Sequence, residues 1–201
     1  FLAAFAVVGA LLAMAFLLVE KQGKLQEGAL KVRKRATAFA GAWLVASVLN
    51  IFLTLANILG TSFADALERN TLRSFLTQVD LGQYLGVQTA MIAVIALAIR
   101  FVRTVLAATI LLLFSLITLT IPVFQSHSAS SGSHQLAIGS LVVHVVALSL
   151  WVGGIFAIVA LPDSDRKFAL PRFSQMALWT AIAVVISGIT NAWARLNFMD
   201  A

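Results

Sequence analysis

Three histidines are the residues of this chain best suited to hold a metal ion or to carry a proton. His127, His134 and His144 lie within one short stretch of the sequence, and the chain contains no cysteine. His144 stands inside an apolar run long enough to cross a bilayer. An ionisable side chain there is a functional-site candidate, because its desolvation must be offset by a partner or a ligand. Without thiolates, soft-metal chemistry depends on imidazole, thioether, carboxylate or backbone oxygen ligands.

Met91 is the candidate thioether ligand that we place in the same region as His144. Imidazole and thioether groups bind a soft ion as neutral ligands, so we expect His144 and Met91 to form an inner site, with His127 and His134 at its entrance. Each residue also has a structural interpretation. A methionine in an apolar helix commonly serves packing alone, His144 can be a hydrogen-bonded packing residue, and the other two histidines can be polar loop residues.

The elements that must position these residues are transmembrane helices. Hydrophobic residues make up 61% of the 201 residues, charged residues make up 11%, and the mean hydropathy is +0.98, which excludes a soluble domain. The sequence predicts an all-α, polytopic transmembrane helix bundle of about six spans. We expect residues 1–201 to form a single transmembrane domain that is part of a longer chain, because Phe1 already lies in a hydrophobic stretch. The predicted spans are residues 1–19, 36–60, 82–102, 104–124, 135–161 and 173–196.

The basic residues follow the predicted membrane topology, which argues against a nucleic-acid partner despite the net charge of +6. Eleven of the 14 lysines and arginines fall in stretches that six spans place on one side, and only Arg69, Arg73 and Arg195 fall on the other. This asymmetry assigns the first side to the cytoplasm. The stretches predicted to be cytoplasmic loops are 20–35 and 161–172, whereas the start of the chain and the loops 61–81 and 125–134 are predicted to be extracytoplasmic.

A stripe of polar residues runs along the second predicted span. Its members recur every three or four residues, so they share one face of a helix. Because lipid cannot satisfy amides, we expect this stripe to face the bundle interior near His144. The alternative is that these residues are ordinary interhelical hydrogen-bonding groups. The stripe comprises Ser47, Asn50, Thr54, Asn57 and Thr61, and the polar residues expected at a similar depth on other spans are Gln83, Tyr84, Gln88, Ser140, Ser187 and Asn191.

A motif in the last two predicted spans points to a known family. His144 is followed by six residues and then by Trp151-Val152-Gly153-Gly154, and the next span carries Arg172-Phe173-Ser174-Gln175 and Ser187-Gly188-Ile189-Thr190-Asn191. This order resembles the CopD family of bacterial copper resistance and copper import membrane proteins. The resemblance covers about residues 120–196, and the first half of the chain matches in hydropathy and topology. We expect Gly153 and Gly154 to allow close helix packing.

The resemblance implies a copper-handling protein of the bacterial cytoplasmic (inner) membrane. It implies that copper is handled at the extracytoplasmic side, and the residues that we expect to bind the ion are His144, His134, His127 and Met91. The copper would be imported or delivered for oxidase assembly, with membrane lipid, an extracytoplasmic copper chaperone or cytochrome oxidase components as partners. The family's domain sometimes occurs fused to a cytochrome c oxidase assembly domain.

Two other functions remain open at the level of sequence. The first is an accessory or assembly subunit of a respiratory membrane complex without active transport. The second is a haem-binding electron-transfer subunit, which is disfavoured because a b-type haem held by two histidines needs both at bilayer depth and only His144 has that position. We do not expect an enzyme, since the chain has no GxxxxGK[ST] phosphate loop and its spans hold few ionisable residues.

Overall fold

The computed structural model describes residues 1–18, 27–60, 68–125 and 134–196, and within these ranges it contains helices and no strand. Every predicted span corresponds to a helix, which confirms the all-α class. The elements are α1 (Leu2–Leu12), continued by the π-helical turn η1 (Ala13–Leu17), α2 (Glu27–Leu59), α3 (Arg69–Gln78), α4 (Asp80–Ala98), continued by the 3-10 turn η3 (Ile99–Phe101), α5 (Val105–Gln125), α6 (His134–Ala160) and α7 (Asp163–Leu196).

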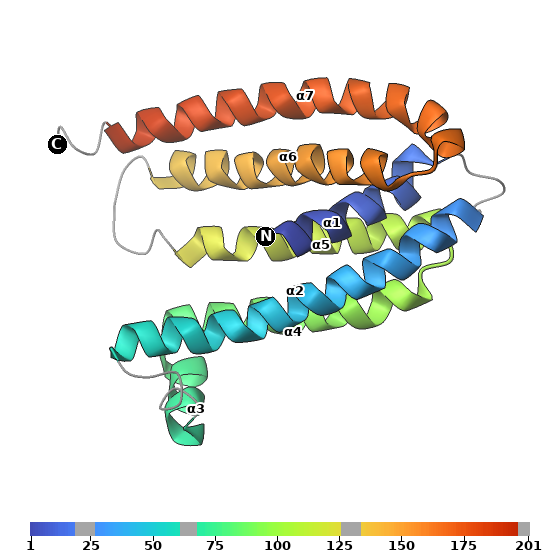
Figure 1. Cartoon of the computed structure of the whole chain (residues 1–201). Helices are drawn as coiled ribbons and strands as arrows, with labels where there is room; N and C mark the ends of the chain where they lie inside the picture. The colour runs from blue at the N-terminus through green and yellow to red at the C-terminus, as the bar shows by residue number, and fades with distance from the viewer. Residues whose placement is uncertain (19–26, 61–67, 126–133, 197–201) are drawn as a thin grey trace.

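The long helices run side by side and form two groups with α1 and α5 between them (Figure 1). On one side, α2 and α4 pack against each other; on the other side, α7 packs along α6. The helix α5 contacts both α4 and α6 and so joins the two groups. Residues of α4 and residues of α6 therefore belong to different parts of the bundle.

Five helices are long and apolar enough to cross a membrane: α2, α4 with η3, α5, α6 and α7. The first apolar helix, Leu2–Leu17, is shorter, so its crossing of the bilayer stays a prediction. It packs against α2, α5 and α6, and most of its side chains are buried. A helix that is apolar on all sides is suited to such a central position.

Two stretches predicted to be cytoplasmic loops are in part helical, and this corrects the sequence prediction. The helix α2 already begins at Glu27, and α7 begins at Asp163. Both helical segments are held at the end of α6, because their arginines donate hydrogen bonds to carbonyl groups of its last turn. Arg35 Nη1 donates to Ala160 O at 3.1 Å, and Arg166 Nε donates to Ile158 O at 3.0 Å.

The helix α3 is a further correction, because the sequence analysis placed residues 61–81 in a loop. It lies crosswise to the long helices at the end of the bundle opposite the α6–α7 turn (Figure 1). Phe75 is buried against Ile51 and Leu55 of α2 and Leu85 of α4. The spacing of Leu72, Phe75 and Leu76 is an amphipathic pattern that could have predicted this helix.

Candidate functional site

His144 lies on α6 and is directed towards α7. Its Nδ1 atom is 3.1 Å from the carbonyl oxygen of Val184 and 3.2 Å from Oγ of Ser187. The imidazole also packs over Gly188, where an added Cβ would stand 3.5 Å from its Cε1 atom. The ring is half-buried, and both of its hydrogen-bond partners belong to one turn of α7.

The hydrogen bonds assign a tautomer to the His144 ring. The Val184 carbonyl can only accept a hydrogen bond, so Nδ1 must carry the proton. The Ser187 hydroxyl donates to Ala183 O and therefore also offers a lone pair to Nδ1. In the neutral ring, Nε2 then carries the free lone pair, which is the state that a metal ion or a proton requires. A backbone carbonyl that orients the other ring nitrogen is the usual support of a histidine ligand.

Further polar residues lie next to His144 along the α6–α7 interface. Because α6 and α7 are antiparallel, the residue one turn before His144 lies opposite the residue one turn after Ser187. This register brings Ser140 of α6 opposite Asn191 of α7. The Oδ1 atom of Asn191 is buried and has no hydrogen-bond partner among the described residues, which is uncommon for a buried polar atom. We call Ser140, His144, Ser187 and Asn191 the α6–α7 polar site.

Among the other predicted metal ligands, only the Met91 side chain lies within the described residues, and it belongs to a helix away from His144. Met91 is half-buried on α4, whereas α6 packs against α1, α5 and α7. The inner pair of His144 with Met91 therefore has no support in the packing of the bundle. The backbone of His134 begins α6, about ten residues or roughly 15 Å along the helix from His144. Its side chain and the whole of His127 lie outside the described residues.

The prediction that the polar stripe of α2 faces His144 is wrong. Ser47 bonds to Thr89 of α4, with 2.6 Å between their hydroxyl oxygens, and Asn50 and Asn57 are exposed on the surface of the bundle. The physical reason is that α2 packs against α1 and α4 and lies away from α6 and α7. Thr61 lies outside the described residues. The α6–α7 polar site thus stands without a contribution from α2.

The glycine pair after Trp151 allows close packing of α6 on both sides, as predicted. A Cβ at Gly153 would press on the backbone of Gly9 in α1, and a Cβ at Gly154 would overlap the ring of Phe173 in α7. Small residues at these contacts let the helix axes approach each other. The motif therefore fixes the position of α6, and with it the position of His144 two turns away.

The site offers few protein ligands to a metal ion. Within the described ranges, no three residues among His, Cys, Asp and Glu lie close enough to hold one. In the α6–α7 polar site the His144 imidazole is the one borderline ligand that Cu(I) accepts, whereas the hydroxyl and amide oxygens are hard donors, so these residues alone would hold Cu(I) weakly. The side chains of this site could be predicted from the sequence, but the Val184 carbonyl could not, because every residue carries a backbone carbonyl.

Comparison with known proteins relates this chain to a family of copper resistance proteins. The family model described as copper resistance protein D-like, N-terminal domain, matches residues 1–136. The match covers α1 to α5 and ends at the start of α6. The resemblance that rests on the motifs around His144 covers about residues 120–196, so the two overlap only at residues 120–136. No curated protein and no solved structure matches the chain.

Proposed function

The chain belongs to the copper resistance protein D-like family, and from this premise we propose that it binds copper at His144 and passes it on. The proposal places this protein in the bacterial cytoplasmic membrane, where it takes the ion from the extracytoplasmic side. The ion is then imported or delivered to a metalloenzyme under assembly. The observation that carries the proposal is the hydrogen-bonded state of His144, whose Nδ1 is engaged by Val184 and Ser187.

The chemistry of His144 suits a copper ion in transit. A neutral imidazole binds Cu(I) through Nε2 without losing a proton, and it adds no charge to the apolar interior of the bundle. The hydrogen bonds to α7 hold the ring in place before the ion arrives, so less freedom is lost on binding. Ser187 acts on the ion only through the ring, because its hydroxyl contacts Nδ1 and not Nε2.

We assign weaker roles in copper binding to the remaining predicted ligands. His134 and His127 bind copper weakly at the extracytoplasmic entrance. Met91 binds the ion only if the ion also passes along α4. Partners of the appropriate chemistry are an extracytoplasmic copper chaperone and components of cytochrome oxidase. We assign no enzymatic reaction to the chain.

Metal analysis of the purified protein tests the proposal. His144→Ala should reduce the bound copper per chain to the background level, while Val142→Ala on the same helix should leave it unchanged. His134→Ala should have a smaller effect than His144→Ala, because loss of a direct ligand of the inner site costs more than loss of an entrance residue. Full copper binding by a folded His144→Ala variant would reject the ligand role and favour the accessory-subunit alternative.

An optical spectrum of the same preparation tests the haem alternative. A protein that holds copper alone should show no Soret band. A Soret band that disappears in His144→Ala would assign the imidazole to haem iron and contradict the copper proposal.

A further inference from the structure

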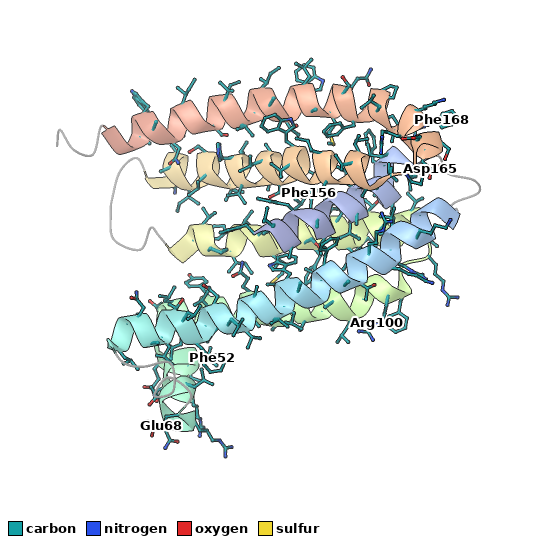
Figure 2. All side chains as sticks on the ribbon, in the orientation of Figure 1. Phe52, Glu68, Arg100, Phe156, Asp165 and Phe168 are labelled. Atoms are coloured by element: carbon teal, nitrogen blue, oxygen red, sulfur yellow. The ribbon has the colours of Figure 1, made fainter. Side chains whose placement is uncertain are left out.

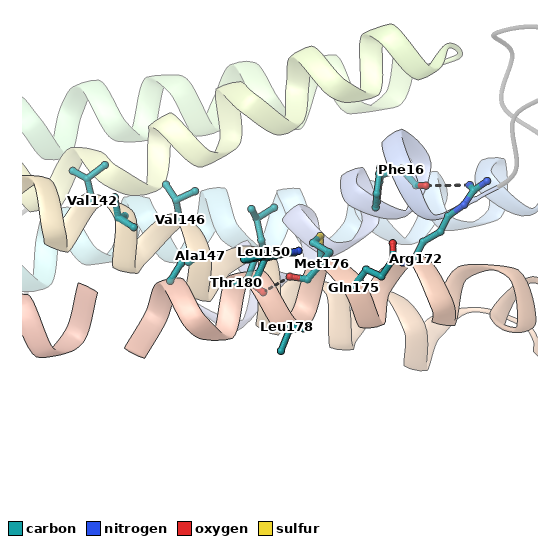
Figure 3. Close-up of a pocket in the computed structure, with 13 residues that line it drawn as sticks. Phe16, Val142, Val146, Ala147, Leu150, Arg172, Gln175, Met176, Leu178 and Thr180 are labelled. Atoms are coloured by element: carbon teal, nitrogen blue, oxygen red, sulfur yellow. Dashed lines mark hydrogen bonds between the residues drawn. The ribbon is translucent and has the colours of Figure 1, made fainter. Parts of the chain in front are cut away.

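A groove lies between α6 and α7 and extends from the side of the α6–α7 turn to the level of His144. It has a volume of about 870 Å³ and runs from Phe16 and Arg172 to Val142 and Ala183. Apart from Arg172, Gln175 and Thr180, its lining is apolar or aromatic. Figure 3 shows Phe16 and Arg172 together at one end of this groove and Val142 at the other.

The groove opens on the outer surface of the bundle. Leu178 and Trp179 line it and are 60% and 70% exposed, and Val143 is 50% exposed. In a membrane protein, such apolar side chains face the acyl chains of lipids. The helix α7 packs mainly against α6, so no other described helix closes this surface.

The length of the groove matches one leaflet of a bilayer. Arg172 and Ala183 are eleven residues apart on α7, or roughly 17 Å at the rise of an α-helix. One leaflet contributes about half of a hydrocarbon core that is about 30 Å thick. The segment from Arg172 to Leu196 spans roughly 36 Å, so Arg172 lies at a membrane boundary when the rest of α7 crosses the bilayer.

The charge at this boundary is positive and has no acidic partner within the part of the chain that the structure describes. Arg172 Nη1 donates to the carbonyl oxygen of Phe16 at 3.3 Å, and no acidic side chain among the described residues forms an ion pair with it. Gln175, on the next turn of α7, is exposed beside it. Arginine at the cytoplasmic boundary is suited to a phosphate group, because its planar donors match the phosphate oxygens.

We propose that this groove binds an anionic phospholipid of the cytoplasmic leaflet. The headgroup phosphate pairs with Arg172, and one acyl chain lies along the groove towards Val142 and Ala183. The lipid covers the open side of the α6–α7 pair and thereby helps to hold α7 against the bundle. This inference is independent of copper binding.

Native mass spectrometry of the purified chain, titrated with phosphatidylglycerol or phosphatidylcholine, tests the proposal. We expect a preference of about fivefold for phosphatidylglycerol, as one cation close to an anionic lipid provides. Arg172→Gln should lower this preference to about twofold or less, and Arg172→Lys should keep most of it. The matched control is Arg100→Gln, because Arg100 is an exposed arginine of the same end of the bundle that does not line the groove.

A second variant tests the groove without changing the charge. Ala183→Phe should fill the inner end and weaken the binding of both lipids, and it keeps the test decisive if Arg172→Gln fails to fold. An equal loss of the preference for phosphatidylglycerol in Arg100→Gln and Arg172→Gln would overturn the proposal. It would indicate that the preference depends on the overall positive charge of the surface and not on Arg172. Full lipid binding by Ala183→Phe, or a second copy of the chain bound in place of lipid, would also overturn it.

Discussion

At position 144 the chemistry depends on which ring nitrogen carries the proton. Two acceptors on α7, the Val184 carbonyl and the Ser187 hydroxyl, lie within hydrogen-bond distance of Nδ1. They leave Nε2 as the nitrogen with a free lone pair. One turn further along, the same helix carries the amide oxygen of Asn191, which has no hydrogen-bond partner in the described ranges. At the scale of single residues, hydrogen-bond acceptors on α7 therefore determine which ring nitrogen of the His144 imidazole on α6 carries the proton.

Removal of the Ser187 hydroxyl should weaken copper binding without abolishing it. Ser187→Ala leaves the Val184 carbonyl as the remaining acceptor for Nδ1, so we expect a loss of about tenfold, at the lower end of the range for residues that orient a ligand. Competition with a chelator of known affinity measures this change. Thr190→Ala is the matched control, because Thr190 Oγ1 donates to Ile186 O of its own helix. An equal loss in both variants would show that the hydroxyl of Ser187 has no specific role.

Asn191→Leu distinguishes a binding role from a structural one. Its Oδ1 atom has no partner to lose among the described residues, so the replacement should not lower the melting temperature, and it can raise it. Copper affinity should nevertheless fall, because the polar group one turn beyond Ser187 on α7 is gone. A lower melting temperature with unchanged copper affinity would contradict this prediction.

At the scale of elements, contacts between glycines determine how closely α6 approaches its neighbours. Gly153 meets Gly9 of α1, and Gly154 makes room for Phe173 of α7. The helix that carries His144 is thus held from two sides by contacts that tolerate no additional carbon atom. These contacts involve backbone or a packed ring, which cannot move aside easily.

Gly9→Ala should destabilise the bundle by about 1–3 kcal/mol, because the new Cβ would overlap the carbonyl group of Gly153. Thermal unfolding in detergent, followed by circular dichroism, measures the effect. Gly41→Ala and Gly139→Ala are matched controls, since a Cβ at either helical position meets no atom within 4 Å. Both controls should be neutral or stabilising by up to about 1 kcal/mol. A neutral Gly9→Ala would show that α1 and α6 do not cross here.

At the scale of the whole molecule, the two ends of the bundle differ in charge. Figure 2 shows Arg100, Asp165 and Phe168 at one end and Glu68, next to α3, at the other. The basic residues of α2 and those in the first part of α7 gather at the first end, where Arg33 donates to Val102 O at 2.9 Å. We predict that this end is the cytoplasmic one from the distribution of lysine and arginine.

Single introduced cysteines test this orientation. Because the sequence contains no cysteine, a thiol reagent reacts only with the introduced residue. Lys167→Cys and Asn70→Cys are exposed at opposite ends, so a membrane-impermeant thiol reagent should label them from opposite sides. Leu178→Cys is the control for lipid burial: it is 60% exposed on the bundle, yet it should resist labelling because lipid covers it. Labelling of Lys167→Cys and Asn70→Cys from the same side would reject the topology.

The sequence alone determined the helical class, the positions of the apolar segments and the charged end of the bundle. These properties follow from local rules: backbone groups in lipid must be satisfied within a helix, and basic residues stay in the cytoplasm. His144 was identified in the same way, as an ionisable residue within an apolar run.

Only the tertiary structure decided which helix each polar face meets. In the bundle, His144 contacts α7, and Asn50 and Asn57 of α2 are exposed. Met91 lies on α4, away from the α6–α7 polar site. Lipid tails are as apolar as leucine side chains, so hydrophobicity does not select a partner for a transmembrane helix. The choice depends on close contacts such as Gly9 with Gly153, and these require two segments far apart in the sequence to fit each other in space.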